Sequence, residues 1–269
     1  EPGCKDLQSS ASPLRHQAIG PFEDDRTIAR GVRYQIGLSA ATDRPISAAD
    51  FRPLPTNGRP MDFSAARKIM VDSQVRVNDV TDRALQAAML AVPRERFVPA
   101  DRAFSAYAEV EVEIANGRRL MLARDLSKLL MALSPQAGEK ALAIAAPYAA
   151  AVLAEAGLSV TAQEEDQAVL DVVGTALSDA GIDAVVGPFS DASGEGYDVI
   201  VCEGAVPGRP EAWLKALNTG GRLAVVERTG PAGKAVLYVK GEGGVSRREL
   251  FDAAPPFLAS LMPEPAFAL

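Results

Sequence analysis

The sequence has a single histidine, His16, and only two cysteines, Cys4 and Cys202, among its 269 residues. Because His16 lies in a polar N-terminal segment, the domain that follows would have no imidazole, which argues against His-ligated metals and most catalytic triads. Two distant cysteines do not make a disulfide framework and favour a reducing compartment. We expect Cys202 to be a small buried residue, since no His or Lys beside it would lower the pKa of its thiol.

The sequence also lacks a surplus of basic residues and a long apolar run. Its formal net charge is −7, which argues against a nucleic-acid partner held through phosphate neutralisation. Apolar stretches such as Leu142 to Leu153 are shorter than the roughly 20 residues that span a bilayer, and Pro147 interrupts this one. Residues 1–5 do not resemble a secretory signal. We therefore expect a cytoplasmic protein with no metal, no nucleic-acid partner and no membrane contact.

Residues 1–60 differ in amino-acid composition from the rest of the chain. They carry 7 of the 19 prolines and no sustained apolar period, so they bury too little apolar surface to offset the entropy of ordering. The first methionine is Met61, and a helical pattern starts directly after it. Residues 1–60 are therefore either a disordered tail or an extension in front of a native start at Met61.

Residues 61–137 predict a helical cap. A helix capped by Ser64 should run to about Val77 with Ile69, Met70 and Val75 on its apolar side. A second helix should follow Thr81 or Asp82 and end at Pro93. Residues 109–114 (EVEVEI) alternate strictly, which predicts a half-exposed strand with its valines and Ile114 inward.

Residues 138–256 alternate between short apolar runs and helical segments. Strands are expected at 140–145, 158–163, 183–186, 197–202 and 222–227, helices at 149–156, 166–179 and 210–217, and a terminal hairpin at 234–240 and 245–251. This pattern is typical of a doubly wound, mostly parallel sheet covered on both faces. Residues 257–269 form a tail that should wrap the surface or be loose.

Four segments of this sequence resemble the alphaproteobacterial form of the protein-L-isoaspartate O-methyltransferase family. They are MDFSAARKIMVDSQVRVNDVTD from Met61, AVPRERFVP from Ala91, YDVIVCEGAVPGRPEAWLKALNTGGRLAVV from Tyr197 and GGVSRRELFDAAPP from Gly243. The resemblance implies a class I methyltransferase (Rossmann-like) fold with a seven-stranded sheet. It also implies S-adenosylmethionine as methyl donor and isoaspartyl carboxylates of damaged proteins as substrate.

The segment that aligns with the family's glycine-rich cofactor loop contains no glycine. It reads Ala141 to Ala146 followed by Pro147 and Tyr148, and Ala143 stands where the family has an acid. Non-glycine residues in a left-handed turn cost roughly 1–2 kcal/mol each, and Pro147 removes a backbone donor. We expect weakened or lost cofactor binding, and we count Tyr148 among the cofactor-site residues, where it either points into the cleft and fills the cofactor's space or does not. The alternative is a different backbone conformation that binds the same cofactor.

Three further positions match the family's cofactor contacts. Glu164, after the second core strand, matches the acid that accepts hydrogen bonds from ribose hydroxyls, although Glu164, Glu165 and Asp166 could instead cap the next helix. Gly187 matches the glycine of a Gly-Asp pair, but Pro188 has replaced the acid. Glu203, after the fourth strand, is the polar group best placed at the switch point of the sheet.

The family's acceptor-side serine is also missing, since Met121 stands at its position and Ala123 at that of a following proline. Arg118, Arg119 and Arg124 nearby could attract an acidic peptide, or they could be solvated charges. Two functions remain: the family's methyl transfer with a weakened cofactor site, or a non-catalytic module that binds a protein or peptide partner. The sequence leaves the catalytic residues unassigned.

Overall fold

The computed structural model describes residues 61–263, and the expectations for residues 1–60 and for the end of the tail lie outside this range. A seven-stranded sheet forms the centre, in the order β5-β4-β3-β6-β7-β8-β9. Five strands are parallel, namely β3 (Lys140–Ile144), β4 (Ser159–Glu164), β5 (Asp183–Val186), β6 (Tyr197–Val206) and β7 (Leu217–Arg228). The hairpin of β8 (Gly233–Gly241) and β9 (Gly244–Ala253) adds two antiparallel strands at one end.

Helices cover both faces of this sheet, as the doubly wound prediction requires. One apolar cluster joins the sheet to α3 (Ala123–Leu133), α4 (Pro147–Glu155) and α5 (Gln167–Asp179), and a second joins it to α6 (Glu211–Ala216). The chain reverses its winding between β3 and β6, so the carboxyl ends of β3, β4, β5 and β6 form the crevice where such folds bind ligands. The predicted fold class is confirmed.

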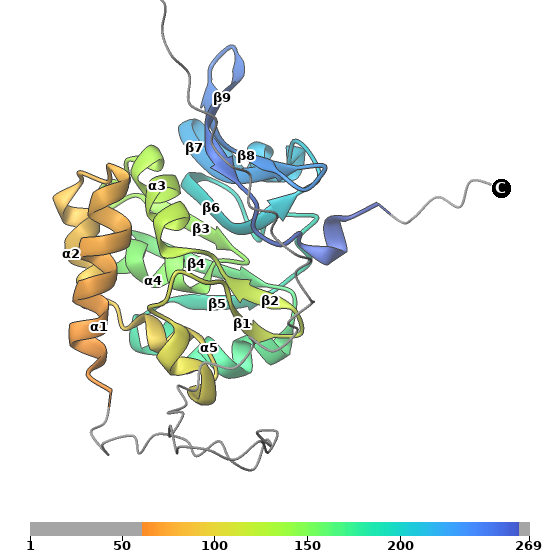
Figure 1. The fold of residues 1–269 in the computed structure, drawn as a ribbon. Coiled ribbons are helices and arrows are strands. Elements are labelled where there is room, and N and C mark those ends of the chain that lie inside the picture. The colour runs from red at the N-terminus through yellow and green to blue at the C-terminus, as the bar shows by residue number, and fades with distance from the viewer. Residues whose placement is uncertain (1–60, 264–269) are drawn as a thin grey trace, which may run out of the picture. The chain divides into compact units, whose positions relative to one another are not determined.

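The N-terminal helices pack beside α3 and α4 at one flank of the sheet, where Figure 1 shows α1 and α2 in orange. Helix α1 (Phe63–Met70) continues through a π-helical turn, Val71–Val75, and a 3₁₀ turn, Arg76–Asn78. Its N-cap is Asp62, whose carboxylate accepts from the Ala65 N–H at 3.0 Å, and not the expected Ser64. The inward position predicted for Ile69 is wrong, since 65% of its surface is exposed.

The second predicted helix is confirmed as α2 (Arg83–Ala91), which Asp82 caps through the Ala84 and Leu85 N–H groups. Short 3₁₀ turns follow at Arg94–Phe97 (η4) and Ala100–Ser105 (η5). Because Pro93 has no backbone N–H, the helix ends before it, as predicted.

A small hairpin, β1 (Val112–Ala115) and β2 (Arg118–Leu120), precedes α3. Val112 and Ile114 are buried as expected, but the inward position predicted for Val110 is wrong because it precedes the strand and is half exposed. Strand β2 and helix α3 were not predicted from the sequence, because residues 116–125 resemble a loop motif of the family.

The C-terminal segment runs back along the end of β6. Ala205 pairs with this segment through the Pro256 carbonyl and the Leu258 N–H, and Leu258 is buried before the last turn, Ala259–Leu261 (η6). Gly204 permits this approach because a Cβ there would lie 2.7 Å from Leu258 Cδ2. Within residues 61–263, no helix is both long and apolar enough to cross a membrane.

Candidate functional site

The turn after β3 is the first part of the crevice. Ala145 adopts a left-handed conformation with φ of 53°, Ala146 is the N-cap of α4, and Pro147 is its first residue. A single non-glycine residue therefore makes the sharp turn, at a cost of about 1–2 kcal/mol. All residues from Ala141 to Leu153 are buried, so this turn presents little surface to a ligand.

Tyr148 lies under the N-terminal cap, fully buried in the cluster that the cap shares with α4. Its ring meets Phe97 edge-on at 5.5 Å, and the Arg94 guanidinium carbon lies 4.6 Å from the ring centre. Burial raises the pKa of Tyr148 to about 12 although Arg94 opposes this shift. Tyr148 therefore packs beneath η4, and its role in the cofactor site stays a prediction.

Glu203 is buried at the N-terminus of α4. Its carboxylate accepts from the Ala149 N–H at 2.9 Å and from the Met121 N–H at 3.3 Å. Because Ala146 has no side chain that could cap the helix, Glu203 supplies a negative group at the positive end of the helix dipole. Burial raises the pKa of Glu203, and nearby Arg94 and the two N–H donors offset only part of this. An internal carboxylate thus takes a position where a helix N-terminus commonly binds an anionic ligand.

Glu164, at the end of β4, is paired with Arg118 from β2. The Arg118 Nε and one Nη lie 3.3 Å from Glu164 Oε2, and the side chains are only 12% and 4% exposed. Burial raises the pKa of Glu164 even though Arg118 lowers it. Of the two sequence interpretations of these acids, helix capping applies to Asp166, which accepts from the Ala168 N–H of α5 at 2.9 Å.

Arg118 also contacts the neighbouring strand ends. The same guanidinium donates to the Ala145 carbonyl after β3, and its central carbon lies 5.9 Å from the ring centre of Phe189 after β5. One side chain therefore bridges the carboxyl ends of three adjacent parallel strands. The sequence analysis treated Arg118 as a surface charge, because nothing local indicates a partner 46 residues away.

The loop after β5 is fixed from inside by Gln163, which the sequence analysis also missed. The Gln163 amide donates to the Pro188 and Asp191 carbonyls at 2.8 and 2.9 Å and accepts from the Ser193 N–H. Gly187 begins this loop, and a Cβ there would lie 3.1 Å from Ser193 Oγ. Gly187 is thus required by close packing within the loop.

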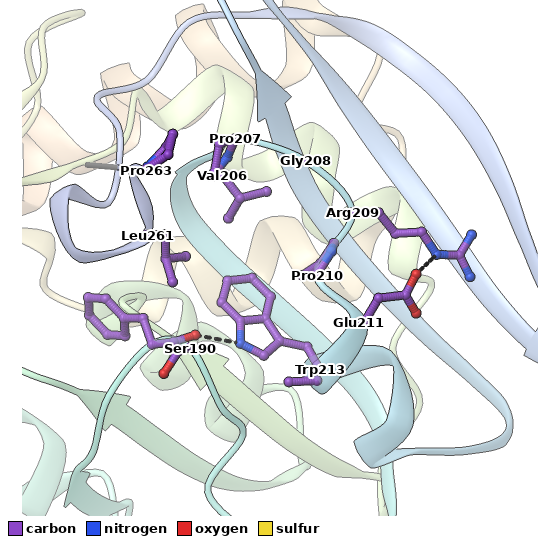
Figure 2. Close-up of a pocket in the computed structure, with 12 residues that line it drawn as sticks. Ser190, Val206, Pro207, Gly208, Arg209, Pro210, Glu211, Trp213, Leu261 and Pro263 are labelled. Atoms are coloured by element: carbon purple, nitrogen blue, oxygen red, sulfur yellow. Dashed lines mark hydrogen bonds and ion pairs between the residues drawn. The ribbon is translucent and has the colours of Figure 1, made fainter. Parts of the chain in front are cut away.

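A cavity of about 590 Å³ lies beside this crevice, between the loops after β5 and β6. Figure 2 shows the Trp213 indole in its wall, with Leu261 nearby and the Arg209–Glu211 ion pair at the other side. The indole N–H donates to the Phe189 carbonyl at 2.8 Å. Its walls are mostly apolar, and Glu164, Glu203, Tyr148 and Gly187 do not line it. The four residues predicted from sequence are thus not gathered around this cavity.

The remaining candidate residues from the sequence are Cys202, Arg119 and Arg124. Cys202 is fully buried, as predicted, and burial raises the pKa of its thiol. Arg119 is exposed, whereas Arg124 pairs with Glu109 at 2.9 Å and with Asp125 at 3.2 Å. Among residues 61–263, no group of three His, Cys, Asp or Glu side chains could hold a metal ion.

Comparison with known proteins decides the family. The family model described as "Protein-L-isoaspartate(D-aspartate) O-methyltransferase (PCMT)" matches residues 66–249. This chain belongs to that family.

Curated relatives support the assignment to the protein-L-isoaspartate(D-aspartate) O-methyltransferase family. A protein-L-isoaspartate O-methyltransferase 1 of Rhodopseudomonas palustris is 33% identical over 187 residues, which are 67% of this chain and 76% of that protein. A protein-L-isoaspartate O-methyltransferase of Methylorubrum populi is 31% identical, with 74% of this chain and 95% of that protein covered. The predicted resemblance is confirmed.

Solved structures of the same family share the fold. One, a protein-L-isoaspartate O-methyltransferase, has a TM-score of 0.60 at 18% identity, over 72% of this chain and 65% of that chain. Another, from Plasmodium falciparum in complex with S-adenosyl-L-homocysteine, has a TM-score of 0.63 at 14% identity, over 71% of this chain and 97% of that chain. The family is S-adenosylmethionine-dependent and acts on protein substrates.

Proposed function

We propose that this protein is a member of the isoaspartate methyltransferase family whose binding of S-adenosylmethionine is weakened or lost. The family's reaction, methyl transfer to isoaspartyl carboxylates in damaged proteins, is the activity against which the chain should be measured. The observation that carries the proposal is the pairing of Glu164, the acid expected to meet ribose hydroxyls, with Arg118.

The residues of the crevice do not fit the methyl donor in this conformation. Glu164 is almost fully buried, and the Ala145 carbonyl accepts a hydrogen bond from Arg118. At the N-terminus of α4, the Glu203 carboxylate accepts from a backbone N–H. A micromolar dissociation constant corresponds to a binding free energy of only about 8 kcal/mol. Breaking a buried ion pair costs about 3–5 kcal/mol. The cost of separating Arg118 from Glu164 would thus offset a large part of the free energy of cofactor binding.

Protein recognition is the second candidate function. Phe104 and Val110 are 59% and 49% exposed on the segment that leads into β1. Arg102 and Arg124 are also partly exposed, and they pair with Glu113 and Glu109. Exposed apolar side chains together with accessible charges suit contact with a peptide. We propose that this surface, residues 100–111 with Arg124, binds a protein or peptide partner, and that the protein acts in the cytoplasm.

A methyl-transfer assay tests the proposed function. Purified protein is incubated with labelled S-adenosylmethionine and an isoaspartyl peptide, with the aspartyl peptide of the same sequence as substrate control and a curated relative as positive control. We expect a rate at least about 100-fold below that of the relative, a loss equivalent to about 2.7 kcal/mol. A rate equal to that of the relative would contradict the proposal.

Binding of the same two peptides, followed by fluorescence anisotropy, tests protein recognition. We expect the labelled isoaspartyl peptide to bind without added cofactor and more tightly than its aspartyl counterpart. Equal or absent binding of both would contradict the recognition of isoaspartyl peptides.

A further inference from the structure

Arg118 is held in its place by the hairpin that carries it. The turn between β1 and β2 has positive φ at both central residues, 47° at Asn116 and 80° at Gly117, as a two-residue hairpin requires. The Asn116 side chain donates to Asp166 Oδ2 at 2.7 Å, which ties the turn to the start of α5. Leu120, two residues after Arg118, is fully buried. The hairpin is therefore anchored on both sides of the arginine.

The ion pair that Arg118 makes with Glu164 is the most buried one in residues 61–263. Its side chains are 12% and 4% exposed, against 14% and 15% for Arg67–Glu95 and 17% and 21% for Arg222–Glu139. Desolvation makes such a pair a poor source of net stability. A stabilising role alone therefore accounts poorly for an arginine at this position.

The contacts of Arg118 are those that a ribose-containing ligand would need. Its donors reach Glu164 at the end of β4 and the backbone carbonyl of the turn after β3, and its guanidinium carbon lies 5.9 Å from the centre of the Phe189 ring after β5. Arg118 donates to both Glu164 oxygens, and Oε1 also accepts from the Glu165 N–H at 3.1 Å. A ribose hydroxyl that donated to the same carboxylate would therefore have to displace one of these donors.

We propose that Arg118 is an internal plug of the cofactor site, which takes the hydrogen-bonding position of the ribose and thereby sets the affinity for S-adenosylmethionine. This inference rests on the proposed function, since it names the residue through which binding is weakened. The lack of glycines in the turn and the plug are separate obstacles, and only the plug is removed by a substitution in β2.

Calorimetric titration with S-adenosylhomocysteine, which cannot react, tests the plug. We expect R118A and R118Q to bind at least about tenfold more tightly than the unsubstituted protein, a change of about 1.4 kcal/mol. R118Q is included as a second variant without the guanidinium, in case R118A proves unstable, and thermal melting checks that each variant is folded. R119Q, at the exposed neighbouring position, removes the same charge and should bind like the unsubstituted protein.

The double variant R118Q/E164Q separates the plug from a general loosening of the crevice. If Glu164 accepts from the ribose once Arg118 is gone, the gain seen in R118Q should be lost again in the double variant. Folded R118A and R118Q that bind no more tightly than the unsubstituted protein would overturn the plug while leaving the proposed weak binding intact. Micromolar binding by the unsubstituted protein, with tighter binding by R118Q, would instead overturn the proposed function and support the plug.

Discussion

At the scale of single residues, the buried carboxyls determine how the protein responds to pH. The folded-state pKa of Glu203 is raised above 4.5, mainly by burial. Its folded form therefore holds a proton more readily than its unfolded form, and the associated stability is present below pH 4.5 and is lost as pH rises through the folded pKa.

The substitution E203Q should remove this dependence. We expect the free energy of unfolding of the unsubstituted protein, relative to E203Q, to fall as pH rises above about 4.5 in urea denaturation series. Glu139 gives the opposite control, since its pair with Arg222 lowers its pKa. Relative to E139Q, the unsubstituted protein should lose stability as pH falls. If the difference in unfolding free energy between the unsubstituted protein and E203Q did not change with pH, the pKa of Glu203 would not be raised in the folded state.

The hydroxyl of Tyr148 provides a second residue-scale prediction. It is buried without a hydrogen-bond partner, whereas the buried Tyr238 bonds to Glu227. We expect Y148F to leave the free energy of unfolding unchanged or to raise it by up to about 1 kcal/mol, and Y238F to lower it by about 1 kcal/mol. Chemical denaturation of both variants measures this, and a loss in Y148F as large as that in Y238F would show that its hydroxyl is satisfied.

At the scale of elements, the turn between β3 and α4 combines strain with complete burial. Ala145 takes a left-handed conformation, so A145G relieves about 1–2 kcal/mol of strain while it loses a methyl group and gains unfolded-state freedom. A143G, in the extended strand β3, also loses a methyl group and gains unfolded-state freedom, but it relieves no backbone strain. We expect A145G to be less destabilising than A143G by about 1 kcal/mol in thermal or urea unfolding. Equal losses would mean that the turn is not strained.

The elements were predictable where local periodicity or capping residues determine them. Asp82 and Pro93 mark the ends of α2, and the Gly-rich link marks the β8–β9 hairpin. Ile69 and Val110 were misplaced because the face that a residue presents depends on which neighbour packs against it. Helix α3 was missed because its residues were compared with a loop motif, although Leu126, Leu129, Leu130 and Leu133 follow a helical period.

At the scale of the whole molecule, the sheet and the family could both be predicted from the sequence, whereas the state of the site could not. Short apolar runs separated by helices are typical of a parallel sheet, and the resemblance supplied its family. The weakened cofactor site that the glycine-free turn predicts stays a prediction. The pairing of Arg118 with Glu164 and of Glu203 with the start of α4 depends on contacts across 46 and 54 residues, for which local patterns give no information.

We propose that internal side chains occupy the polar positions that a methyl donor would use. Calorimetric titration of the unsubstituted protein with S-adenosylmethionine tests it most directly. The account predicts no saturable heat at a ligand concentration of about 100 μM, roughly a hundred times a micromolar dissociation constant. Saturable binding with a micromolar constant would contradict it.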